Sequence, residues 1–116
     1  MINALIDQKE DTMDQILELG GNIELKGFSD VDKGSMVIVK KIIGNYAKKF
    51  SEKNKDFSKL VLTMKGVHER EKSEKYELHG NVLLGGQTVA AKITDRNLFY
   101  AIDKVLKKLE NGMKAL

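Results

Sequence analysis

Few side chains in this sequence could carry out acid–base or nucleophilic chemistry. The chain has two histidines, His68 and His79, and no cysteine. Neither histidine stands near an acid and a nucleophile in a recognisable catalytic pattern, and we expect His79 to be an ordinary surface residue. The lack of cysteine excludes disulfides and thiolate metal sites. We therefore expect a protein that is not an enzyme and that uses no cofactor, metal ion or small-molecule substrate.

One loop weakly resembles a calcium-binding loop. It contains Asp30, Asp32 and Gly34, but the spacing of the acids is shifted. Lys41 also occupies the position at which such a loop places its bidentate acid. We interpret these residues as loop and helix-capping residues.

The lysines are the remaining candidates for a site, because clustered ammonium groups bind nucleic-acid phosphates and release counterions. Residues 36–50 contain four lysines and no acid, and residues 97–116 contain four lysines with Asp103 and Glu110. The two segments carry a charge of +6 in a chain of net charge +3, which leaves −3 elsewhere. The alternative is that these lysines only keep helix faces soluble. The candidate RNA-binding residues are Lys40, Lys41, Lys48, Lys49, Lys104, Lys107, Lys108 and Lys114.

Two amphipathic helices are expected to position these lysines. In residues 97–116 the apolar side chains recur every three or four positions, from Leu98 to Met113, and the lysines occupy the other side. Residues 33–51 include a β-branched run, Met36–Val39, that would suit a strand. The helical spacing of Val39, Ile42, Ile43, Tyr46 and Phe50 nevertheless predicts a helix. Gly44 inside it suggests close packing against a neighbour.

Four strands are predicted from alternating apolar and polar residues. They span about residues 22–28, 59–69, 76–84 and 87–94, and the pair Gly85-Gly86 forms a hairpin turn between the last two. The expected order is strand, helix, three strands, helix. Because each element has one apolar side, we predict an α+β fold with both helices on one face of a four-stranded sheet and the other face solvated.

The first 21 residues are predicted to be a helical extension that ends at Gly20-Gly21. Residues 22–116 then form a single domain. No apolar run approaches the ~20 residues needed to cross a bilayer, and the N-terminus lacks the pattern of a signal peptide. We therefore expect a cytoplasmic protein without a membrane partner.

Three segments resemble the ribosome hibernation-promoting factor and ribosome-associated inhibitor family. The most specific is LFYAIDKVLKKL, residues 98–109, in which Ile102-Asp103 and Lys108-Leu109 match the family position by position. YELHGNVLLGGQTVAAKITDRN, residues 76–97, is similar to the family's third strand, glycine turn and fourth strand. NYAKKF, residues 45–50, resembles the end of its first helix. The resemblance covers roughly residues 22–116 and suggests a short form or a remote relative.

The resemblance implies both a fold and a function. The family fold is β-α-β-β-β-α and is related to double-stranded-RNA-binding domains. Its members bind the small ribosomal subunit along the messenger and tRNA channel, contact rRNA with basic residues of both helices, and block translation. Asn97 stands where the family usually has Asp, and Lys107 stands where an acid is frequent. The resemblance assigns rRNA contact to Lys48, Lys49, Lys104, Lys107, Lys108 and Lys114.

Two other functions fit the sequence. The scarcity of arginine and of exposed aromatic residues indicates recognition of RNA backbone and shape rather than sequence, so a general double-stranded-RNA-binding module is one alternative. The other is a protein-interaction domain that forms homo-oligomers through the N-terminal extension or the open sheet face. On that face Val61, Leu83 and Ala90 add apolar area.

Overall fold

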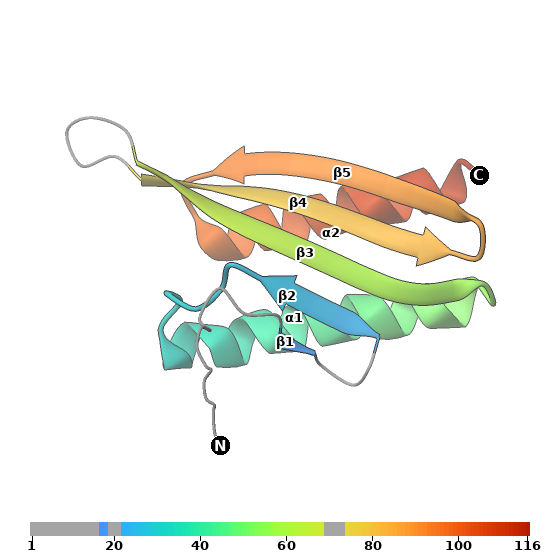
Figure 1. The fold of residues 1–116 in the computed structure, drawn as a ribbon, viewed down its shortest axis with the longest axis horizontal. Coiled ribbons are helices and arrows are strands. Elements are labelled where there is room, and N and C mark those ends of the chain that lie inside the picture. Colours follow the sequence, from blue (N-terminus) through green and yellow to red (C-terminus); the bar gives the residue numbers. More distant parts are fainter. Residues whose placement is uncertain (1–16, 19–21, 69–73) are drawn as a thin grey trace, which may run out of the picture.

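The computed structural model describes residues 17–18, 22–68 and 74–116. It shows an α+β fold in which two helices cover one face of a mixed sheet (Figure 1). Strands β2 (Ile23–Lys26) and β3 (Phe57–His68) are parallel and are connected through α1 (Lys33–Lys53), whereas the other neighbouring strands are antiparallel. The predicted order of strand, helix, three strands and helix is confirmed. The elements are β1 (Leu17–Glu18), β2 (Ile23–Lys26), α1 (Lys33–Lys53), β3 (Phe57–His68), β4 (Glu74–Leu84), β5 (Gln87–Asp95) and α2 (Leu98–Lys114).

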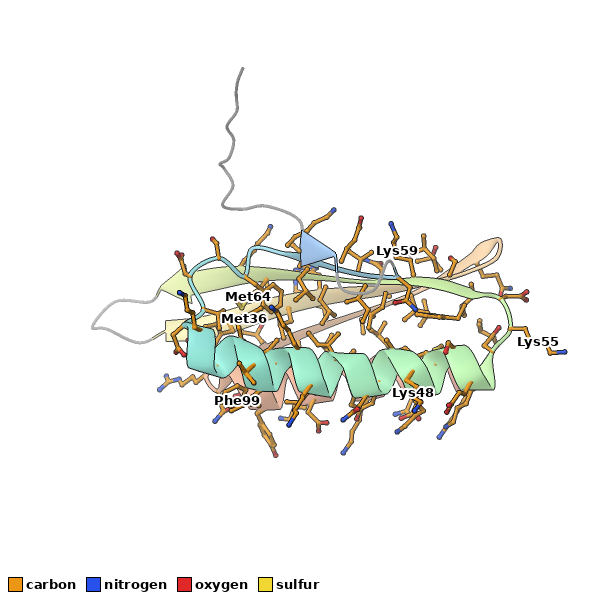
Figure 2. All side chains as sticks on the ribbon, turned by 90° about the horizontal axis from the view of Figure 1, so that it is seen from below. Met36, Lys48, Lys55, Lys59, Met64 and Phe99 are labelled. Atoms are coloured by element: carbon orange, nitrogen blue, oxygen red, sulfur yellow. The ribbon has the colours of Figure 1, made fainter. Side chains whose placement is uncertain are left out.

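The core lies between the helices and the inner face of the sheet. Leu60 and Leu62 of β3 face this layer together with Leu78 and Val82 of β4, as the alternation along each strand requires. The helices contribute the apolar stripes that their sequences predict. In Figure 2 the labelled Met36 and Met64 lie between α1 and the sheet. The fully buried helix residues include Val39, Ile43 and Phe50 of α1 and Ile102, Val105, Leu106 and Leu109 of α2.

Helix α1 begins where the sequence places a cap. The carboxylate of Asp32 accepts a hydrogen bond from the backbone N–H of Ser35 at 2.7 Å and one from its hydroxyl at 3.0 Å. The capping role predicted for Asp32 is thus confirmed, and the cap satisfies a backbone donor that has no partner inside the helix. Burial of Val39 outweighs the strand preference of the β-branched run. The helix continues to Lys53, two residues beyond the predicted end.

The prediction for Gly44 is wrong. A Cβ atom at this position would have no heavy atom within 4 Å, apart from the chain neighbours and the helix's own backbone. Gly44 therefore lies on a side of α1 that no other described element covers, and close packing does not explain it. The structure shows no other reason for a glycine here.

The hairpin turn at Gly85-Gly86 is confirmed. Leu84 pairs with Gln87, so two residues connect β4 and β5, and Gly85 has a φ of +60°. A positive φ at the first of two turn residues suits the twist of the flanking strands and favours glycine.

The N-terminal prediction is corrected where the structure describes it. The sequence predicted helix through Leu19, but Leu17 and Glu18 form β1, which pairs with Leu25 and Glu24 of β2 and adds a fifth strand to the sheet. The physical reason is the unpaired backbone edge of β2, which an adjacent extended segment satisfies. The remainder of the predicted helical extension, residues 1–16 and 19–21, lies outside the described residues. The predicted oligomer contact through this extension stays a prediction.

The sheet face opposite the helices carries mainly polar side chains. Lys59 Nζ donates a hydrogen bond to Glu24 Oε2 at 3.1 Å in an ion pair, and the labelled Lys59 lies on this side in Figure 2. Val61 and Leu83 also lie here and are partly exposed, and Ala90 is exposed. In the part of the chain that the structure describes, no helix is long and apolar enough to span a membrane.

Candidate nucleic-acid interface

The two lysine-bearing helices lie side by side and run in the same direction. The Tyr46 hydroxyl of α1 donates a hydrogen bond to Asp103 Oδ1 of α2 at 3.1 Å. Seven residues further along both helices, Lys53 Nζ lies 3.1 Å from Glu110 Oε2. Because both contacts advance together, the helices are parallel and form one continuous outer surface. Lys48, labelled in Figure 2, points away from the sheet on this surface.

The helix layer is the positively charged part of the molecule. Helix α1 contains six lysines and one glutamate, a charge of +5, and α2 contains four lysines and two acids, a charge of +2. The whole chain has a net charge of +3, so the residues outside the two helices carry −4. With the helix bounds that the structure gives, the two segments thus carry +7 and the rest −4, compared with +6 and −3 for the ranges predicted from the sequence.

Helix geometry of about 100° per residue separates the lysines of α1 into three directions. Lys41 and Lys48 point outward, and neither makes an ion pair with any other described residue. Lys49 points toward α2, where its Nζ lies 3.6 Å from Glu110 Oε2 and 4.9 Å from the centre of the Tyr46 ring. Lys40 lies on the side away from α2, where it lines a groove.

The lysines of α2 separate in the same way. Lys107 points outward and lies 3.6 Å from Asp103, one turn away. Lys114 is exposed at the end of the helix. Lys104 lies at the edge of the outer side: its Nζ is 4.4 Å from the centre of the exposed Tyr100 ring and 3.5 Å from Asp95 Oδ2 of β5. Lys108, four residues later, lies about 40° further round the helix, on the flank toward β5.

The structure thus brings together six of the eight predicted residues. We call them the lysine surface, and Lys40 and Lys108 lie on its two opposite flanks. The lysine surface consists of Lys41, Lys48, Lys49, Lys104, Lys107 and Lys114.

Two acids lie in the seam between the helices. The hydrogen bond from Lys53, followed by the charges of Lys49, Lys53 and Lys114, holds the pKa of Glu110 below its ordinary value despite partial burial. Asp103 accepts the hydrogen bond of Tyr46. Glu110 and Asp103 therefore reduce the local positive potential along the seam. Among the six lysines of the lysine surface, the least compensated are Lys41 and Lys48.

Sequence reasoning missed one residue of this surface. The Tyr100 side chain is 56% exposed on the outer side of α2, and Lys104 Nζ lies 4.4 Å from the centre of its ring. An exposed aromatic ring beside lysines can stack on an unpaired base. The signal was present in the sequence, since Tyr100 falls on the polar side of the predicted helix, where an aromatic residue needs a reason.

The other candidates for chemistry lie on the opposite face. His79 Nε2 is 2.5 Å from Glu77 Oε2, and Lys92 Nζ is 4.0 Å from the same oxygen. The contact with His79, more than the charge of Lys92, lowers the pKa of Glu77. Within the described ranges, no group of three or more His, Asp or Glu side chains is arranged to hold a metal ion.

Helix α2 is capped by Asn97, which stands where the family that the sequence resembles usually has Asp. The Asn97 side chain accepts a hydrogen bond from the backbone N–H of Tyr100 at 3.0 Å, and Asp95 accepts one from the N–H of Asn97 at 2.9 Å. Asparagine caps helices as well as aspartate does, so this departure is compatible with the cap that begins α2. No protein-family model and no curated protein matches the chain.

Proposed function

We propose that this protein binds small-subunit rRNA through the lysine surface and thereby inhibits translation on idle ribosomes, as the family that its sequence resembles does. The observation that supports this proposal is the parallel, side-by-side placement of the two helices. It combines two lysine faces, far apart in the sequence, into a single surface.

The chemistry of this surface suits the phosphate backbone. Lysine is a compact point charge that binds phosphate without reading the base, and each neutralised phosphate releases counterions. The lysine surface contains no arginine, the side chain that most often recognises guanine by two hydrogen bonds. Recognition would therefore depend on the shape of the folded rRNA, with Tyr100 available to stack on an unpaired base.

The internal ion pairs do not prevent phosphate binding. Lys104 and Lys107 are 45% and 65% exposed, and exposed pairs of this kind contribute only ~0–1 kcal/mol to stability. Each of these two lysines can leave its carboxylate partner and bind a phosphate instead with a small loss of free energy. Among the described residues, Lys41 and Lys48 have no such partner to leave.

The direct test is sedimentation of the purified protein with small ribosomal subunits over a range of salt concentrations. We expect binding that weakens steeply with salt, with a slope of log affinity against log salt near −0.9 for each phosphate contacted in duplex regions. Binding that is insensitive to salt, or no binding at low salt, would contradict the proposal.

General binding of duplex RNA is the second candidate, and the lack of base-reading groups on the lysine surface favours it. A competition experiment separates the two functions. If free duplex RNA displaces the protein from subunits at equal nucleotide concentration, the general function is correct. If a large excess is needed, the subunit is the preferred partner.

A further inference from the structure

A groove lies beside the lysine surface, between the loop after β2 and the first turns of α1. Its volume is about 410 Å³. Its apolar lining comes from Phe28 and Val31 of the loop and from Met36 and Val37 of α1, and its rim carries Lys33 and Lys40. The groove therefore combines an apolar floor with two positive charges.

One apolar side chain at this groove, Val37, is unusually exposed for a helix that packs on a sheet. It is 62% exposed, although it belongs to a β-branched run in an otherwise well-packed domain. The adjacent Ile38 is 47% exposed but points about 100° further round the helix and does not line the groove. No element among the described residues covers them. Exposed apolar side chains that border a groove indicate a binding surface.

The path of the chain places the start of β1 at the end of the sheet where this groove lies. Strand β1 is antiparallel to β2, with Leu17 opposite Leu25 and Glu18 opposite Glu24. The chain therefore enters β1 at the end of the sheet where β2 ends at Lys26 and Phe28 follows. Phe28 is the first residue that lines the groove.

The composition of residues 1–16 complements the groove. This segment contains four acids and one lysine, a side-chain charge of −3, together with several large apolar residues. Its length is sufficient, because the stretch of α1 from Lys33 to Lys40 is only about 10 Å long, whereas 16 extended residues span about 50 Å. The apolar residues are Ile2, Leu5, Ile6, Met13 and Ile16, and the acids are Asp7, Glu10, Asp11 and Asp14.

We propose that residues 1–16 bind this groove of the same chain. Their apolar side chains cover Val37 and Met36, and their acids lie beside Lys33 and Lys40. The bound segment adds negative charge next to the lysine surface and covers Lys40. It consequently weakens RNA binding, a consequence that rests on the function proposed above, whereas the docking itself does not.

The docking is tested without RNA. Because the chain has no cysteine, Gln8→Cys gives a single site for a nitroxide spin label in the full-length protein. We expect the amide NMR signals of Val37 and Lys40 to lose at least about half their intensity, relative to the reduced label, while those of Thr88 and Ala90 on the opposite face keep theirs. Unchanged signals at Val37 and Lys40 would overturn the proposal.

Two controls separate the proposed contact from its alternatives. Lys33→Glu with Lys40→Glu should remove the signal loss, whereas Lys41→Glu with Lys48→Glu, an equal charge change on the outward side of the same helix, should preserve it. Equal effects of the two pairs would overturn the assignment to the groove. Signal loss in a mixture of spin-labelled and separately ¹⁵N-labelled molecules would mean that a second copy supplies the segment, and would overturn it too.

The regulatory consequence has its own measurement. Replacing Asp7, Glu10, Asp11 and Asp14 by the corresponding amides should reduce the signal loss and raise the affinity for small subunits several-fold. If the signal loss falls but the affinity is unchanged, docking is correct and regulation is wrong. If the native chain binds no RNA at all, the proposed function fails while the docking result stands.

Discussion

At the residue scale, Tyr46 joins the two helices through a titratable group. Burial, and then its hydrogen bond to Asp103 and the charge of that carboxylate, raises the pKa of Tyr46 to about 12 from an ordinary value of 10.0. The folded state therefore holds this proton more tightly than the unfolded state does. The resulting stabilisation is complete below pH about 10 and is lost as the pH rises toward 12.

This linkage gives the first prediction. The free energy of unfolding of the native protein should fall more steeply between pH 10 and pH 12 than that of Tyr46→Phe. At pH 7 the substitution should cost about 0.5–1.5 kcal/mol, the usual net value of one hydrogen bond. Urea unfolding at several pH values measures both effects. Parallel pH profiles for the two proteins would show that the phenol of Tyr46 titrates at its ordinary pKa.

Gly44 gives the second prediction. A Cβ atom here would meet nothing within 4 Å outside its own helix backbone, so alanine should gain helix propensity without a clash. We expect Gly44→Ala to raise the free energy of unfolding by about 0.5–1 kcal/mol. Thermal denaturation compares it with the native chain. A lower melting temperature would mean that the glycine is needed for a reason that the structure does not show.

At the element scale, the close approach of α2 to the sheet depends on Gly80 of β4. A Cβ atom at this position would lie 2.7 Å from Leu109 Cδ1 and 3.1 Å from Leu62 Cδ2, both fully buried. Because Gly80 has no side chain, the side chains of Leu109 and Leu62 occupy the space beside the β4 backbone. A larger residue at position 80 must displace these two buried leucine side chains.

The third prediction follows from this contact. Gly80→Val should lower the free energy of unfolding by about 1–3 kcal/mol, as overpacking of a dense core usually does. Gly86→Val in the hairpin turn serves as a comparison, because a Cβ atom there meets nothing within 4 Å. Denaturant unfolding of both variants measures the difference. If the two cost the same, packing against Leu109 is not the cause.

The seam between the helices gives a prediction about binding. Glu110 carries negative charge in the middle of a positive surface, and Lys49 and Lys53 compensate it. Glu110→Gln should therefore raise the affinity for small subunits, because it removes a negative charge from the positive surface. Glu77→Gln makes the same charge change on the opposite sheet face and should leave the affinity unchanged. An equal gain from both variants would point to net charge instead of the seam.

Some elements could be predicted from the sequence and others could not. The helices and the four longer strands follow from local periodicity, and Asp32 and Gly85-Gly86 follow from the local needs of a cap and a turn. Strand β1 could not be predicted, because two residues carry no period and their pairing depends on the edge of β2. The open space beside Gly44 could not be predicted either, because it depends on which elements pack against each side of α1.

At the scale of the whole molecule, the site was only partly visible in the sequence. The eight lysines were found from the charge of their segments and, for six of them, from the family resemblance. The parallel arrangement that joins six of the eight, and places Lys40 and Lys108 on opposite flanks, is seen in the contacts of Tyr46 and Lys53 with α2. These contacts link residues 57 positions apart, and no local pattern encodes such a distance.

We propose that the lysine surface, rather than positive charge in general, binds the small subunit. Three substitutions, Lys41→Gln, Lys48→Gln and Lys107→Gln, remove three charges from that surface. Lys26→Gln, Lys55→Gln and Lys65→Gln remove the same number from other parts of the molecule. Both variants have the same net charge, so only the location of the lost charges differs.

The decisive measurement is the affinity of these two variants and the native chain for purified small ribosomal subunits at several salt concentrations. We predict that the first variant binds much more weakly and that its salt slope is smaller by up to about three, because each lost phosphate contact reduces the slope by about one. The second variant should bind as the native chain does. Equal affinities of the two variants would contradict the account.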